Sequence, residues 1–252
     1  MDTALFSPSS LFGGSDSNST DEENTETQQN FVERKHQFPE MELLIQEFSF
    51  HQMNANLLWP GTFAFAEWLA QHTSWLRGLL LHVINVSSPG TGALAIFLRK
   101  SYLDITTSDY DDPDIEENIA HNCQANGVLP TLPHIRHSWG DVFPVADPDW
   151  DLIVASDILL YVKQYDNLVK TLCFLLKSYK PKVNETGSGT SEEKDICPLP
   201  RPAFLMSWRR RIGKEDESLF FTGCEKAGLE VNHLGSRVYC IKPKETSSIE
   251  AV

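Results

Sequence analysis

The sequence predicts an α/β fold, in which helices cover both faces of a mainly parallel sheet and a C-terminal antiparallel hairpin closes it. Two observations predict it. From Leu79 onward, short apolar segments of strand length alternate with longer amphipathic segments of helix length. Near the end, two strand-like segments are separated only by the turn Leu234–Gly235–Ser236. A turn this short joins antiparallel strands, because parallel strands need a longer crossover.

The elements can be placed in chain order. Two precede the sheet: a strand at Glu42–Phe50 and a helix at Thr62–Leu76, whose apolar residues recur at helical spacing. The seven predicted strands of the sheet are Leu80–Val86, Ile105–Thr107, His134–His137, Leu152–Ser156, Phe204–Trp208, Glu230–His233 and Val238–Ile241. The predicted helices between them are Gly92–Tyr102, Ile115–Asn126, Tyr165–Tyr179 and Ser218–Ala227.

The length of 252 residues favours one domain, which we place at residues 39–245. Residues 1–38 are mostly polar and acidic, which predicts a disordered N-terminal tail. The Gly/Ser-rich segment 180–202 is typical of a flexible insertion before the fifth strand. Residues 246–252 are expected to form a C-terminal tail.

Composition excludes several classes of partner and cofactor. The chain has 21 Lys and Arg against 35 Asp and Glu, a net charge of −14 that disfavours nucleic acid and anionic membranes. Its five cysteines and eight histidines show no metal-ligand spacing, so we predict no bound metal. The scattered cysteines also predict a reducing compartment. Neither a secretory signal nor a membrane-spanning apolar run is recognisable. We expect a cytoplasmic or nuclear protein, and its oligomeric state stays open.

A glycine-containing turn joins the first strand of the sheet to the next helix. Gly90 and Gly92 would let the backbone approach a ligand closely at the helix N-terminus, although an ordinary tight turn also uses glycine. Asp109 follows the second strand, seventeen residues beyond Gly92. A carboxylate at this place can accept hydrogen bonds from the ribose hydroxyls of a nucleoside cofactor.

Two further candidates lie where later strands end. Trp139, beside Gly140, would pack against an adenine ring or else inside the core. Asp157 follows the fourth strand, at the sheet edge where open α/β sheets bind their ligands. Asp111, Asp112 and Asp114 are explained by capping of the next helix, and the basic run Arg209–Arg211 by exposure to solvent.

Together these segments resemble the family-16 methyltransferases, Rossmann-like seven-strand enzymes that include protein-lysine methyltransferases and nicotinamide N-methyltransferase-like proteins. The resemblance covers about residues 40–243 and rests on the segments Leu58–Gly61, Gly90–Ala95, Thr107–Asp109, Glu116–Asn122, Trp139–Asp141 and Ala155–Tyr161. It implies a cofactor, S-adenosyl-L-methionine (SAM), held by Trp59, Gly90, Gly92, Asp109 and Trp139.

The resemblance also implies the reaction, which is transfer of the SAM methyl group to a lysine amine of a partner protein. A lysine ammonium has no lone pair, so the site must favour the neutral amine. Asp157 and Tyr161 would orient this amine as the catalytic residues. Three residues separate Asp157 from Tyr161 here, where many relatives have two.

The first loop departs from the family pattern, which is an acid followed by three alternate glycines. This chain has Val86 in place of the acid and Ser88 in place of the first glycine, and Pro89 lacks an N–H group. An inactive pseudo-methyltransferase that serves as a binding module is therefore one alternative. An NAD-dependent oxidoreductase is another, because Gly90, Gly92 and Ala95 also fit a dinucleotide-binding pattern.

Overall fold

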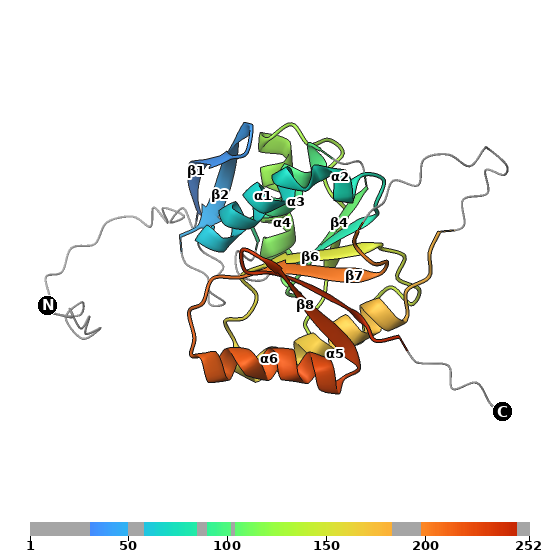
Figure 1. Ribbon diagram of the computed structural model, residues 1–252. Helices are drawn as coiled ribbons and strands as arrows, with labels where there is room; N and C mark the ends of the chain where they lie inside the picture. Colours follow the sequence, from blue (N-terminus) through green and yellow to red (C-terminus); the bar gives the residue numbers. More distant parts are fainter. Residues whose placement is uncertain (1–30, 50–57, 85–89, 102–103, 183–197, 246–252) are drawn as a thin grey trace, which may run out of the picture.

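The computed structural model describes residues 31–49, 58–84, 90–101, 104–182 and 198–245 (Figure 1). Within them, a seven-stranded sheet has the strand order β5-β4-β3-β6-β7-β9-β8. Its strands are β3 (Leu81–Ile84), β4 (Ile105–Asp109), β5 (His134–Arg136), β6 (Leu152–Ser156), β7 (Ala203–Ser207), β8 (Leu229–Gly235) and β9 (Val238–Pro243). Strands β3 to β7 are parallel, and β9 pairs antiparallel with β7 and β8. The predicted mainly parallel sheet with a terminal hairpin is confirmed.

Helices cover both faces of the sheet. They are α1 (Pro60–Gln71), α2 (Thr73–Leu76), α3 (Ala93–Arg99), α4 (Pro113–Ala125), α5 (Tyr165–Lys177) and α6 (Lys214–Lys226), with a short 3₁₀ helix at Val162–Gln164. Helices α1, α3 and α4 lie on one face, and α5 and α6 lie on the other (Figure 1). In β6 the buried side chains alternate accordingly, since Val154 packs with the first group and Ile153 with the second.

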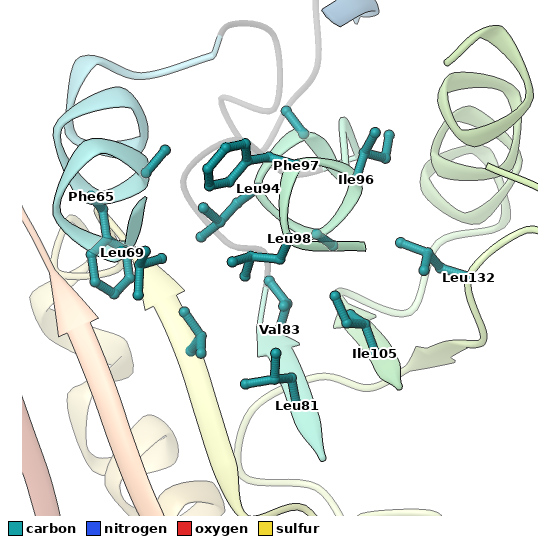
Figure 2. Packing of buried hydrophobic residues seen from close by; sticks show 14 of the residues in the cluster. Phe65, Leu69, Leu81, Val83, Leu94, Ile96, Phe97, Leu98, Ile105 and Leu132 are labelled. Carbon is teal, nitrogen blue, oxygen red and sulfur yellow. The ribbon is translucent and has the colours of Figure 1, made fainter. Parts of the chain in front are cut away.

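The packing between α1, α3 and β3 is shown in Figure 2. Leu81 and Val83 point from β3 toward α3, where Leu98 lies over them, and Leu69 of α1 belongs to the same buried cluster beside Phe65. All four side chains are almost completely buried. Removing this apolar area from water stabilises the position of α1 and α3 over the centre of the sheet.

A two-stranded hairpin precedes the sheet and corrects the predicted tail. Its strands are β1 (Phe31–Phe38) and β2 (Met41–Phe48), so residues 31–38 do not belong to a disordered segment. Most side chains of β1 are polar and exposed, so in the sequence this segment resembled a disordered tail. It is anchored by buried Phe38 and by Arg34 and His36, which contact the buried carboxylate of Glu47 at 3.0 and 2.9 Å.

Two asparagines of α4 and the asparagine that caps its C-terminus fasten this hairpin to the helix. Asn118, Asn122 and Asn126 are spaced four residues apart, which places them on one helix face. The Asn122 side chain accepts a hydrogen bond from the backbone N–H of Gln46 at 2.7 Å and donates one to its carbonyl at 3.0 Å. Asn126 makes the same pair of bonds with Leu44, at 2.9 and 2.7 Å. The side chains thus pair with the edge of β2 as a neighbouring strand would.

The predicted insertion 180–202 is too long at both ends. The Lys180 backbone N–H donates to the Pro148 carbonyl at 2.8 Å, and Leu199 is buried in the core at 6% exposure. Residues 183–197, 1–30 and 246–252 lie outside the described residues, and so do Val86, Ser88 and Pro89.

The predicted helix Thr62–Leu76 is in fact α1 and α2, divided at His72. There the His72 Nδ1 lies 2.7 Å from the carbonyl oxygen of Trp68, beside the backbone bonds that end α1.

Candidate active site

The candidate site lies at the carboxyl edge of the sheet, on both sides of β3. Asp109 ends β4 and Asp157 follows β6, and these two strands are the neighbours of β3. Two strand spacings correspond to about 10 Å between their ends. The chain extends the sheet from β3 in one direction through β4 and in the other through β6. This is the topological switch point at which open α/β sheets bind ligands.

Asp109 is buried, at 3% exposure, and holds the glycine turn. Its Oδ2 accepts a hydrogen bond from the Gly90 N–H at 2.9 Å, and its Oδ1 accepts one from the Tyr110 N–H at 2.7 Å. Burial raises the pKa of Asp109 to about 8, although both backbone bonds favour the ionised form. A carboxylate has about four lone-pair positions. Two of them are used here, which leaves acceptor capacity for the hydroxyl groups of a ligand.

The glycines of this turn are required by its geometry. Gly90 has φ +80° and Gly92 has φ +65°, a region that other residues rarely adopt. A Cβ at Gly90 would come within 2.6 Å of the Phe48 ring, and one at Gly92 within 3.0 Å of Ile119. The turn is therefore wedged between β2 and α4, whose side chains leave room only for glycine.

Two of the α4 asparagines also hold the turn. Asn118 donates to the carbonyl of Gly90, and Asn122 donates to the carbonyl of Thr91 at 3.0 Å. At the start of the same helix, Asp112 accepts from the Asp114 N–H at 3.0 Å, which confirms its predicted capping role. The Gly90 carbonyl is thus bonded to α4, while its N–H is bonded to Asp109.

Asp157 is held in an unusual backbone conformation beside α1. Its φ is +52°, and its N–H donates to the Ser207 carbonyl of β7 at 2.8 Å. The side chain is 2% exposed, and its Oδ1 accepts from the Arg209 N–H at 2.8 Å. A Cβ at Gly61 would lie 2.0 Å from Oδ2, so the carboxylate rests directly on the backbone of α1. Burial raises the pKa of Asp157, while the Arg209 amide and the charge of Arg211 lower it.

Arg211 belongs to this site, and its prediction as a solvated residue was wrong. Its guanidinium carbon lies 3.4 Å from the ring centroid of Trp59, and its Nη2 lies 3.8 Å from Oδ2 of Asp157. The side chain is 21% exposed. One signal for it was available, because Arg211 follows β7, the strand next to β6, at the same carboxyl edge. Arg210, by contrast, is an exposed partner of Glu217 at 2.7 Å.

The other predicted residues lie around the same edge. Trp59 caps α1 and contacts Arg211. Trp139 is half-buried against the core beneath α5, next to Gly140, whose N–H donates to Thr171 at 3.1 Å. Tyr161 is half-buried immediately before the 3₁₀ helix. The roles of all these residues in binding and catalysis stay predictions.

The residues present fit the nucleoside part of a cofactor such as SAM. The observation that supports this fit is the spare acceptor capacity of Asp109 beside a turn whose glycines carry no side chain. The methionine part would meet the segment that contains Val86 and Ser88, outside the described residues. Among the residues that the structure describes, no three His, Cys, Asp or Glu side chains gather as metal ligands.

A separate cavity of about 310 Å³ opens at the opposite, amino-terminal edge of the sheet, between Asp104, Pro133 and Lys182. It lies away from both carboxylates of the candidate site. In the described part of the chain, no helix has the length and apolarity that a membrane crossing demands.

The sequence profile of a family described as lysine methyltransferase matches residues 37–190. Human histone-arginine methyltransferase METTL23 is 30% identical over 131 residues, which are 50% of this chain and 65% of that protein. The protein N-terminal and lysine N-methyltransferase efm7 of Aspergillus fumigatus is 23% identical over 145 residues, 53% of this chain and 55% of that protein. The chain therefore spans less than two thirds of either relative.

Among solved structures, the T. thermophilus 16S rRNA N2 G1207 methyltransferase RsmC, in complex with AdoMet and guanosine, superimposes with a TM-score of 0.54. It shares 13% sequence identity and covers 85% of this chain and 51% of its own. At this identity the likeness concerns the fold alone, and it agrees with the sheet order described above.

Proposed function

Since this chain belongs to the lysine methyltransferase family, we propose that it is a SAM-dependent methyltransferase that modifies a lysine of a partner protein. One observation carries the proposal beyond family membership. The carboxylate that ends β4 is bonded to the Gly90 N–H at the switch point, and a second buried carboxylate, Asp157, lies across β3. One carboxylate is suited to a nucleoside, and the other to an amine.

On the cofactor side, SAM would supply a methyl group activated by its sulfonium. Asp109 would accept hydrogen bonds from the ribose hydroxyls, through lone pairs that Gly90 and Tyr110 leave unused. The Gly90–Gly92 turn would let the backbone approach, and Trp139 would pack against the adenine ring.

On the acceptor side, Asp157 would receive the amine. The exclusion of water around this carboxylate would strengthen a hydrogen bond between Oδ2 and the lysine nitrogen. Because burial raises its pKa, Asp157 is also a better proton acceptor than an exposed carboxylate. It would hold the amine nitrogen in line with the methyl group, and Tyr161 would contribute to its orientation. The two relatives above are named for transfer to protein nitrogen atoms, which supports a protein acceptor.

A binding module without catalysis is the second candidate. It is favoured by Val86, which cannot accept a hydrogen bond from the ammonium group of the methionine part, and by Ser88 and Pro89. The oxidoreductase alternative is set aside, since the family match explains the same glycines and Asp109.

Calorimetric titration with S-adenosylhomocysteine and with NAD tests the cofactor assignment. We expect S-adenosylhomocysteine alone to bind, and Asp109→Ala to lose about 1.5–3 kcal/mol, or about tenfold to a hundredfold in affinity. Asp111→Ala is the matched control, because it removes a nearby exposed carboxylate. Unchanged affinity in Asp109→Ala would contradict the assignment.

Methyl transfer is tested with tritiated SAM and a protein extract as acceptor. We expect labelled protein with the unaltered chain and none with Asp157→Ala, which should still bind S-adenosylhomocysteine. Cofactor binding without any labelled protein would favour the binding module over the enzyme.

A further inference from the structure

We propose that Trp59 and Asp157 form a binding site for one alkylammonium group, and that Arg211 of the same chain fills it until an acceptor displaces it. The inference rests on the proposed function, since the alkylammonium would be the side chain of the acceptor lysine. Arg211 would then act as an internal competitor that sets how readily an acceptor enters.

The site already holds a cation. The guanidinium of Arg211 lies over the ring of Trp59 at 3.4 Å from the centroid, with the carboxylate of Asp157 on another side at 3.8 Å. An aromatic face and a carboxylate are the two groups that attract an organic cation in a partly buried place. Trp59 stands at the N-cap position of α1, and Gly61 of the same helix leaves space for the carboxylate.

Arg211 fits this site incompletely. Its Nη1 and the Oδ2 of Asp157 are both buried, and within the described residues neither has a partner at hydrogen-bond geometry, although the backbone N–H of Gly61 is close enough to the Asp157 carboxylate to lower its pKa. The 3.8 Å between Nη2 and Oδ2 is too long for a hydrogen bond. A buried ion pair whose polar atoms are not satisfied contributes little to stability. An ammonium is compact and its three donors rotate, so over the same ring it can also donate to Oδ2, which the guanidinium of Arg211 does not do in this arrangement.

Arg211 can leave the site without disturbing the sheet. It lies between β7 and α6, in the stretch Trp208–Gly213 that forms neither helix nor strand. Its side chain is 21% exposed, whereas that of Asp157 is 2% exposed. The guanidinium therefore covers the carboxylate from the solvent side, and its removal exposes the acceptor position.

The test uses n-butylammonium chloride, which copies the end of a lysine side chain, titrated at pH 8 and followed by calorimetry. We expect Arg211→Ala to bind it saturably and at least tenfold more tightly than the unaltered chain. Arg77→Ala, which removes an exposed guanidinium elsewhere, should behave as the unaltered chain does. The double variant Arg211→Ala, Trp59→Leu should lose the binding again.

Neutral n-butanol is the second probe, and it should not bind any of these proteins. Equal affinity of Arg211→Ala and the unaltered chain for n-butylammonium, or equal binding of n-butanol, would overturn the proposal. If circular dichroism shows that Arg211→Ala does not fold, Arg211→Gln keeps a polar side chain without the charge and carries the same expectation. Cofactor is absent throughout, so failure here leaves the results for S-adenosylhomocysteine and methyl transfer standing.

Discussion

Asp109 combines deep burial with two backbone donors, and these have opposite effects on its ionisation. Burial dominates and raises the pKa of this carboxyl to about 8, well above its value in an unfolded chain. Between about pH 4 and pH 8 the folded protein therefore keeps a proton that the unfolded chain releases. The contribution of Asp109 to stability should therefore decrease as the pH rises through this range and level off above pH 8.

Asp109→Asn should flatten this pH dependence, because an amide does not titrate. Urea unfolding at pH 5 and pH 8 would measure it, and the loss of stability between the two pH values should be smaller in the variant. The variant should also be less stable at both pH values, since its NH₂ group would face a backbone N–H. Equal losses in both proteins would mean that folded Asp109 is already ionised at pH 5.

The candidate residues differed in how well sequence could find them. Asp109 and Asp157 were found because each stands where a strand ends, and Gly90 because it precedes the helix that follows β3; strand ends of a parallel sheet meet at one edge. Arg211 was missed because its place in the site depends on its contact with Trp59, which is far away in the sequence and comes close only through the position of α1. A run of three arginines does not reveal in sequence whether one of them is partly buried or all three are exposed.

At the scale of elements, the asparagine side chains of α4 bond the free edge of β2 in the way that a neighbouring strand would. Asn122 alone bonds both backbone groups of Gln46 and the carbonyl of Thr91. The side chain is fully buried, so its loss would remove three hydrogen bonds from groups that water does not reach, although the Gln46 carbonyl would keep its bond from the Asn118 side chain at 3.1 Å.

Asn122→Ala should therefore destabilise the protein by about 2–4 kcal/mol, from the loss of three buried hydrogen bonds. Gln124→Ala, on the exposed side of the same helix, should stay within about 0.5 kcal/mol of the unaltered chain. Urea unfolding of the two variants gives the comparison. A small effect of Asn122→Ala would show that β2 finds other partners.

The turn between β3 and α3 carries the prediction on cofactor affinity. We expect the chain to bind S-adenosylhomocysteine weakly, and Val86→Glu, Ser88→Gly, Pro89→Ser together to restore micromolar affinity. Each native residue removes a feature of the family loop that is worth about 1–3 kcal/mol. Equal, tight binding before and after the change would show that the family's acid is dispensable here, and no binding by either would contradict the predicted pocket.

The strands and helices of the sheet were predictable because their apolar periods are strong, whereas β1 was not. β1 has apolar residues mainly at its ends, and its middle is ordered by ion pairs with Glu47, which sequence periodicity does not reveal. Likewise the prediction of α1 and α2 as one helix followed the apolar repeat across the break at His72.

For the whole molecule, the extent of the insertion determines how much chain can be removed. Replacing residues 183–197 with a short Gly/Ser linker should change the free energy of unfolding by no more than about 1 kcal/mol, a loop-closure effect. Extending the replacement to residue 200 removes the buried Leu199 and should cost about 2–5 kcal/mol. Thermal or urea unfolding distinguishes the two deletions, and equal stability would mean that Leu199 contributes nothing.

The asparagine contacts also bear on the order in which the chain folds. They join residues 76 and 82 positions apart, from Gln46 to Asn122 and from Leu44 to Asn126, and both partners must already be formed as strand and helix. Such distant pairings are entropically expensive to form early. The hairpin is thus expected to dock after the central strands have assembled, so Asn122→Ala should accelerate unfolding and leave the folding rate almost unchanged in stopped-flow measurements.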